Sequence, residues 1–245
     1  MEALKITEND VKKTLRLRDI FLFEYKIAES ILKKVFEEKC NDDVKIVLPK
    51  VKILNYFYSA GIYTIDIEPM VKHIIQLAKN NELDKCLQEG NYSIVNKIAH
   101  LQKNDNTTKY YFSFATKFCC FHNPEAYPIY DFYIKEVLKR VCYDKRILKK
   151  SKWINENRIT GSEWNGNPPQ GEGYEAFVKI YKDFRDTCFE NPNISFKDMD
   201  RYIWGSRKIE SMKDSIRKEY TEYKNIWNSI CENELNRYMN NNKTK

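Results

Sequence analysis

The stretch from Phe112 to Val141 constrains the fold more than any other part of the chain. It reads FSFATKFCCFHNPEAYPIYDFYIKEVLKRV, an apolar segment followed by a break and a second periodic segment. Proline disfavours the helical conformation in the residue before it and is not tolerated inside a helix. Asn123-Pro124 and Tyr127-Pro128 therefore predict a short rigid connector between two helices.

Asp131 stands where the second of these helices begins. Apolar residues follow it at helical spacing, at Ile134, Val137, Leu138 and Val141. Aspartate is a preferred N-cap residue, because its side chain accepts a hydrogen bond from the first turn. The sequence leaves two interpretations of this carboxylate open, a helix cap and a functional group.

The rest of the chain predicts an all-α protein. It has only seven glycines and seven prolines in 245 residues, so turns are few and helices are long. Aromatic residues make up 14% of it, which is typical of a folded protein. We expect one helical unit over 1–245, or two lobes at 1–110 and 111–239 with a cleft between them, and a disordered tail at 240–245.

Apolar spacing also predicts where single elements begin and end. We expect one helix over Leu15–Glu38 and another over Lys50–Ala60, opened by Pro49. Val44–Leu48 shows weak strand alternation, and Lys103–Lys109 is polar enough to predict a flexible loop. Ser195 is expected to cap a short helix that Gly205 ends.

The proline-containing connector that ends in an aspartate at the start of an amphipathic helix resembles the active-site segment of the helix-hairpin-helix DNA glycosylases, the endonuclease III and 8-oxoguanine glycosylase group. The resemblance covers about thirty residues around Asp131. It implies a two-lobed helical domain with Asp131 in the cleft as the catalytic carboxylate.

The chain departs from that family's pattern at two points. The family's hairpin contains glycines, and the polar run from Lys103 to Lys109 has none. The family's catalytic lysine lies about eighteen residues before the aspartate, which here falls near Ser113. Lyase activity is therefore not expected, and Lys117 and Lys109 are the displaced amine candidates.

Several residues are candidates for contact with nucleic acid. The expected loop and a basic segment after the second helix supply the phosphate contacts, Lys103, Thr107, Thr108, Lys109, Lys145, Arg146, Lys149, Lys150 and Lys152. Aromatic side chains that can stack on a flipped base are Tyr127, Tyr130 and Trp204. The alternative for each is a solvated linker, an exposed helix end or a core residue.

Charge and cysteine usage add weak constraints. The net charge of +7 favours a polyanionic partner such as DNA, although 35 acidic residues balance most of the basic ones. Seven cysteines without a CxxC pair predict free thiols in a reducing compartment, and no apolar run predicts a membrane segment, so we expect a cytoplasmic protein. The three histidines are widely spaced, so we expect no metal and no cofactor.

Two classes of function follow. The first is a DNA glycosylase-like enzyme that flips out and excises a modified or damaged base, with Asp131 stabilising the oxocarbenium ion. The second is a non-catalytic helical protein that binds nucleic acid or another protein, with Asp131 serving only as a cap.

Overall fold

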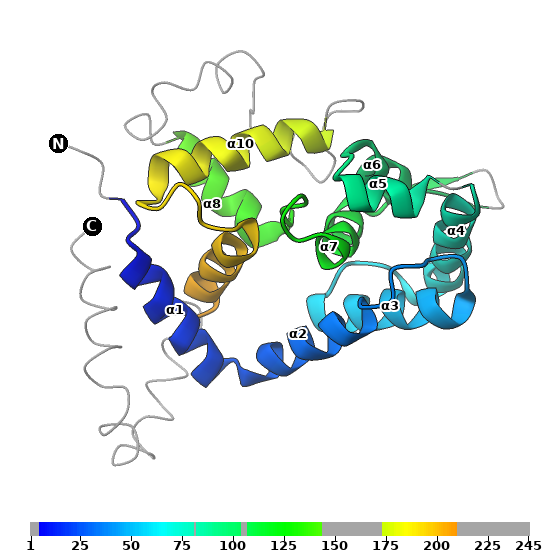
Figure 1. The fold of residues 1–245 in the computed structure, drawn as a ribbon, viewed down its shortest axis with the longest axis horizontal. Helices are drawn as coiled ribbons and strands as arrows, with labels where there is room; N and C mark the ends of the chain where they lie inside the picture. The colour runs from blue at the N-terminus through cyan, green and yellow to red at the C-terminus, as the bar shows by residue number, and fades with distance from the viewer. Residues whose placement is uncertain (1–4, 81, 104–106, 144–172, 210–245) are drawn as a thin grey trace.

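The computed structural model describes residues 5–80, 82–103, 107–143 and 173–209. Over these ranges the chain is all-α, apart from one short two-stranded hairpin (Figure 1). The helices are α1 Glu8–Phe21, α2 Phe23–Val35, α3 Val44–Tyr58, the 3-10 turn η1 Thr64–Asp66, α4 Ile67–Lys79, α5 Leu83–Glu89, α6 Ser93–Ala99, α7 Phe112–His122, α8 Phe132–Tyr143, α10 Gly173–Cys188 and a further helix over 196–209.

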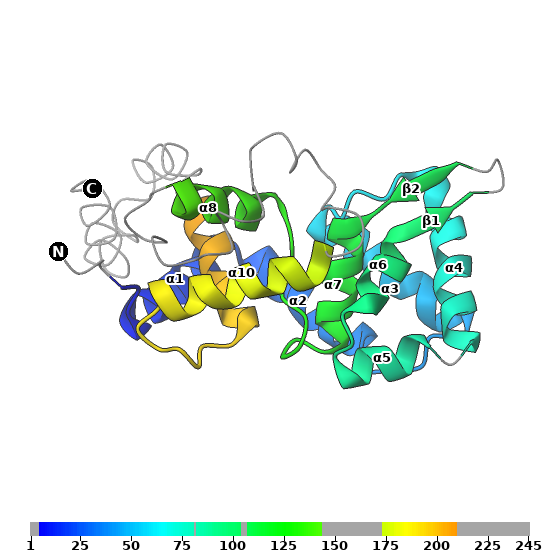
Figure 2. The same cartoon turned by 90° about the horizontal axis from the view of Figure 1, so that it is seen from above.

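The helices gather at two ends of an elongated molecule. Helices α3 to α6 lie at one end with the hairpin, and α1, α8, α10 and helix 196–209 lie at the other (Figures 1 and 2). Helices α2 and α7 run between the two ends. Since α1 lies with the C-terminal helices, the two ends do not coincide with a division of the sequence at residue 110.

A single apolar core joins both ends. It runs without interruption from Val11 and Leu32 through Phe114 and Phe118 to Ile203. Helix α7 is its centre, because Phe112, Phe114, Ala115, Phe118, Cys119 and Cys120 are all buried. Helix α7 is therefore the most enclosed of the described helices.

The N-terminal part contains two helices where the sequence predicts one. Thr7 and Asp10 form a capping box that starts α1, several residues before the predicted start at Leu15. Leu22, with φ −127° and ψ 41°, then separates α1 from α2. The apolar spacing continues across this residue, so periodicity alone does not reveal the break.

The predictions around Pro49 are wrong. Helix α3 begins at Val44, where Asp43 caps it by accepting a hydrogen bond from Lys45 N–H at 2.8 Å. Val44–Leu48 is thus helical, and Pro49 lies inside the helix. Because proline has no N–H, the helical hydrogen bond from residue 49 to the Lys45 carbonyl is absent.

The expected flexible loop at Lys103–Lys109 is wrong at its end, because Thr108 and Lys109 belong to a strand, while residues 104–106 lie outside the described residues. Strands β1 (His100–Gln102) and β2 (Thr108–Tyr110) pair antiparallel, and Lys103 N–H donates to the Thr107 carbonyl at 2.8 Å. Gly205 does not end its helix either, because helix 196–209 continues through it. None of the described helices has the length and apolarity that a membrane crossing requires.

Candidate functional site

Asp131 lies at the N-terminus of α8, as the sequence predicts. Its Oδ1 accepts a hydrogen bond from Ile134 N–H at 2.9 Å, and its carbonyl accepts one from Lys135 N–H at 3.0 Å. The connector before it is fixed through Thr116 of α7, whose hydroxyl accepts from Tyr130 N–H at 3.1 Å. Asp131 is half-buried, so its carboxylate is both a cap and partly open to solvent.

Lys117 lies inside the core next to Asp131. Only 3% of it is exposed, and its Nζ donates to Ser113 Oγ, one turn earlier on α7, at 2.8 Å. Burial lowers the pKa of Lys117, and the charges of Asp131 and Asp200 oppose that shift. The predicted amine is therefore close to Asp131 electrostatically, but in this conformation it is sealed from solvent.

Asp200 is a third ionisable group that interacts electrostatically with Lys117 and Asp131. It belongs to helix 196–209, and its Oδ1 is enclosed with no hydrogen-bond partner among the described residues. Burial and the negative charge of Asp131 raise the pKa of the Asp200 carboxyl well above its ordinary value, and Lys117 opposes them. We call Lys117, Asp131 and Asp200 the buried triad.

Paired charges hold the helix that carries Asp200. Glu29 of α2 is 9% exposed and lies against Lys197 and Arg201 of helix 196–209, with Nζ to Oε1 of 3.0 Å and Nε to Oε1 of 3.0 Å. Burial would raise the pKa of Glu29, and these two cations lower it overall. Glu29 therefore fixes the helix that presents Asp200.

The buried triad combines groups that serve acid–base chemistry. The Asp131 carboxyl group is in a half-buried residue, and the Asp200 carboxyl group has an enclosed oxygen. Such a difference in surroundings gives two carboxyl groups different pKa values, so that one is ionised while the other keeps its proton. Enclosed polar atoms without partners are rare in folded proteins and call for a specific explanation. The Tyr181 hydroxyl of α10 is also enclosed without a hydrogen-bond partner among the residues described, as are polar atoms of Thr14, Asp66, His122 and Ser206.

Lys103 and Lys109, two of the candidate phosphate contacts, form ion pairs with the buried carboxylate of Asp66. Asp66 is 0% exposed, and its oxygens lie 2.5 Å from Lys103 Nζ and 3.0 Å from Lys109 Nζ. The Tyr111 hydroxyl donates a third hydrogen bond to Asp66. Burial would raise the pKa of Asp66, but these three donors lower it to about 2. The two lysines therefore anchor the hairpin to η1.

The remaining phosphate candidates fall into two groups. Thr107 and Thr108 are exposed at the hairpin. The basic segment that follows α8 lies outside the described residues, namely Lys145, Arg146, Lys149, Lys150 and Lys152.

The three stacking candidates differ in their surroundings. Tyr127 is 0% exposed and its hydroxyl donates to the Cys86 carbonyl at 2.7 Å, so it is a core residue and offers no face to a base. Tyr130 is half-buried beside Asp131 and packs edge-on against Phe112 and Phe177. Trp204 is half-buried and packs edge-on against Tyr25 at 4.3 Å between ring centroids.

Sequence reasoning missed Asp200 and Asp66. Asp200 lies between Phe196 and Ile203 at spacings of four and three, so a carboxylate on the apolar face of a helix was the available signal. Lys117 carries the same signal between Phe114 and Phe121, at spacings of three and four. Asp66 has none, because its partners come from a strand pairing that the sequence does not predict.

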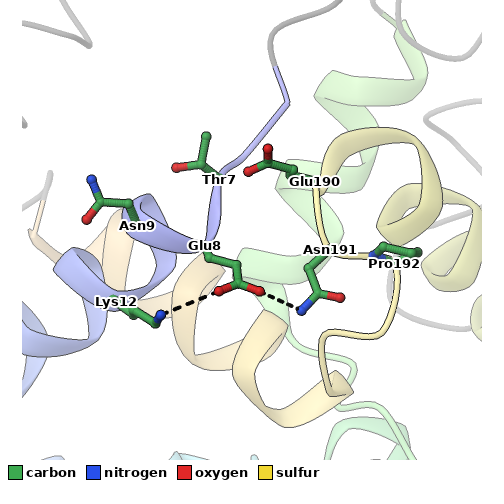
Figure 3. A pocket seen from close by; sticks show the side chains of 7 residues that line it. All are labelled: Thr7, Glu8, Asn9, Lys12, Glu190, Asn191 and Pro192. Carbon is green, nitrogen blue, oxygen red and sulfur yellow. Dashed lines mark hydrogen bonds and ion pairs between the residues drawn. The ribbon is translucent and has the colours of Figure 1, made fainter.

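Lys50 of α3 is another buried ionisable group: it is 0% exposed, and its Nζ donates to the Glu38 carbonyl at 2.6 Å and to Asn41 Oδ1 at 2.9 Å. Burial lowers its pKa to about 8. No group of three or more histidine, cysteine, aspartate or glutamate residues among them could hold a metal ion. A surface pocket lies where the start of α1 meets the turn after α10 (Figure 3). There Glu8 already contacts Lys12 at 3.4 Å and Asn191 at 3.1 Å, and none of the triad lines it.

Comparison with known proteins finds similarity to a family over part of the chain. Residues 7–126 match the model of the HI_0787_N family, described as an N-terminal domain. An uncharacterized protein of Haemophilus influenzae is 28% identical over 202 residues, which cover 80% of this chain and 83% of the relative. No solved structure matches the chain. The chain is thus similar to this family over α1 to α7, a region that includes Lys117 and ends before Asp131.

Proposed function

We propose that the protein is a DNA glycosylase-like enzyme that flips a modified or damaged base out of DNA and breaks its N-glycosidic bond. The observation that supports this most is the place of Asp131, half-open at the start of α8 and backed by Lys117 and Asp200. The similar family carries no known activity into the argument, so the proposal depends on the site and on the resemblance of the connector.

Asp131 acts on the sugar. As the bond to the base breaks, positive charge develops on C1′, and a carboxylate beside it stabilises that charge. A unit-charge pair at about 4 Å in an effective dielectric of about 20 contributes around 4 kcal/mol, or roughly a thousandfold in rate. Lys117 is sealed beside Ser113, so we expect an uncleaved abasic site and no lyase product.

The test uses duplexes that each carry one modified base, among them uracil, hypoxanthine, 8-oxoguanine and 7-methylguanine. Wild type should leave abasic sites in at least one of them. Asp131→Asn should lower the single-turnover rate about a thousandfold, because the charge is lost. Asparagine caps helices as well as aspartate does, so the melting temperature should stay unchanged.

Asp43→Asn is the matched control, since Asp43 caps α3 in the same way. It should keep full activity. If wild type releases no base from any duplex, the enzymatic proposal is refuted.

The hydrogen bond from Ile134 N–H to Asp131 favours a second candidate, a non-catalytic helical protein that binds nucleic acid or another protein. In that case Asp131→Ala should cost about 1 kcal/mol of stability through loss of the cap. Retention on DNA that weakens with salt would then separate a nucleic-acid partner from a protein partner.

A further inference from the structure

The buried triad contains one carboxyl group more than the proposed mechanism uses. Asp131 suffices to stabilise the sugar cation, and Lys117 balances charge inside the core. Asp200 remains, on a helix that packs against both α1 and α8 (Figures 1 and 2). Lys208 of this helix lies 5.6 Å from the centre of the Tyr133 ring of α8, which brings the helix to the side of α8 where Asp131 begins it.

Asp200 has the environment of a carboxylic acid that keeps its proton. Its Oδ1 is enclosed and accepts no hydrogen bond from the described residues, so an ionised oxygen there would lose its solvation without compensation. The residue as a whole is half-buried.

The charges around Asp200 come from several elements. Asp131 of α8 and Glu29 of α2 are negative and favour the protonated form, while Lys117 of α7 and Arg201 of its own helix are positive and oppose it. The neutral titratable neighbours are Tyr58, Cys120 and Tyr181. Burial acts in the same direction as the negative charges, and together they raise the pKa of Asp200.

We propose that Asp200 is the general acid of this site and gives its proton to the departing base. The inference rests on the proposed glycosylase function and adds a second catalytic residue to it. The roles divide between an open carboxylate and an enclosed acid, as in enzymes that cleave glycosidic bonds with two carboxyl groups.

The step balances without any further reactant. The C1′–N bond breaks, its electron pair stays with the base, and the Asp200 carboxyl proton is transferred to a nitrogen of the base. Asp131 stabilises the resulting cation at C1′. Water then forms the C1′–O bond and loses one proton, which restores the acid form of Asp200 through solvent.

The proton on Asp200 is measured first, without reference to activity. An infrared difference spectrum between wild type and Asp200→Asn at pH 7 should show the carbonyl stretch of a protonated carboxylic acid. Asp198→Asn, on the same helix and paired with Ser195 and Arg201, is the control and should not remove that band. If wild type lacks the band, Asp200 is ionised and the inference is overturned.

The second measurement separates acid catalysis from a structural role by the charge of the leaving base. Hypoxanthine and 8-oxoguanine are neutral and need a proton to depart, whereas 7-methylguanine is already cationic. Asp200→Asn should slow release of the neutral purines at least about a hundredfold and release of 7-methylguanine less than about tenfold. The wild-type rate on the neutral purines should fall as pH rises through the pKa of Asp200, and the variant should lose that fall.

The outcomes separate this inference from the proposed function. Equal losses on neutral and cationic bases would indicate that the variant damages the fold, and they would overturn the acid role. Unchanged rates on both, or a wild type that releases only 7-methylguanine, would also overturn it while leaving a glycosylase in place. A wild type that releases no base refutes the proposed function, and the acid role with it, even if Asp200 carries a proton.

Discussion

At the scale of single residues, buried charges are the main device of this protein. Lys117, Asp66 and Glu29 are each less than 10% exposed, yet each is ionisable and lies on or beside an apolar helix. Groups of this kind are retained only when partners offset the loss of solvation. Asp66 and Glu29 have such partners within hydrogen-bond distance, whereas Lys117 has only Ser113 and more distant carboxylates. Lys117 is therefore the least directly paired of these three buried charges.

Asp66 should make stability depend on acid. Its pKa is lowered from 3.8 to about 2 in the folded protein, so the unfolded chain takes up a proton at a higher pH than the folded one. The stabilisation is fully present above about pH 4 and is lost as pH falls towards 2. Urea midpoints between pH 2 and pH 7 should show this loss in wild type and a smaller one in Asp66→Asn.

Glu68→Gln is the control for Asp66, because Glu68 pairs with Lys72 at the surface. This variant should lose as much stability as wild type when the pH falls from about 4 to 2, since exposed ion pairs contribute little to stability. If both variants lose the pH dependence of stability below about pH 4 to the same extent, Asp66 does not anchor the hairpin.

Alanine substitutions at two glycines should distinguish the cost of backbone strain from the cost of a steric clash. Gly61 and Gly90 have φ of +84° and +72°, but only at Gly90 would a Cβ meet a neighbour, Ala126 Cβ at 2.9 Å. Gly61→Ala should cost about 1 kcal/mol from backbone strain alone, and Gly90→Ala about 2–3 kcal/mol. Denaturant titrations measure both, and equal costs would show that Ala126 moves freely.

At the scale of elements, the sequence predicts helices wherever a strong local signal marks them. Pro124 and Pro128 define the connector, Gly90 ends α5, and Asp131 starts α8. The hairpin was missed because a distant partner decides its local structure. The hairpin strands are only three residues long each, and Asp66 holds them from a segment far away in sequence.

In the candidate site too, residues whose role depends on their own helix were predicted, and residues whose role depends on distant segments were not. Asp131 was identified because its role as a cap depends on its own helix. Asp200 was not, because its environment is made by α7 and α8, far from it along the chain. Tyr127 looked like a stacking surface from its place beside Pro128, yet the Cys86 carbonyl holds its hydroxyl in the core.

Helix 196–209 should become more stable when Gly205 is replaced. Its φ is not positive, and a Cβ there would lie 3.5 Å from Thr14 Cγ2 and 3.6 Å from Arg18 Cβ, which are ordinary contact distances. Gly205→Ala should therefore raise the free energy of unfolding by about 1 kcal/mol. A loss instead would show that α1 is displaced, and adding Thr14→Ala should then recover it.

At the scale of the whole molecule, one apolar core joins the two ends, and a group of ion pairs ties α2 to one of them. Glu29 connects α2 to helix 196–209 through Lys197 and Arg201 and lies 3.6 Å from Arg18 of α1. Because the core is continuous, we expect unfolding in one cooperative step over the described residues.

Glu29→Gln tests that connection. It keeps the shape of the side chain but removes the charge that three cations share, so it should cost about 3 kcal/mol. Glu24→Gln, exposed on the same helix, should be nearly neutral. A single transition should persist in thermal melts of both variants, and a second transition in Glu29→Gln would contradict the single-core description.

The short parallel bridge between Ile6 and Phe189 has a consequence for synthesis on the ribosome. Ile6 N–H donates to the Cys188 carbonyl at 2.7 Å, and α1 then packs on helix 196–209 through Thr14 and Arg18. Helix α1 leaves the exit tunnel first, but it can dock only after helix 196–209, the last helix described, has been synthesised. A nascent chain arrested near residue 126 should still leave α1 open to proteases, and protection should appear only after residue 209 has emerged.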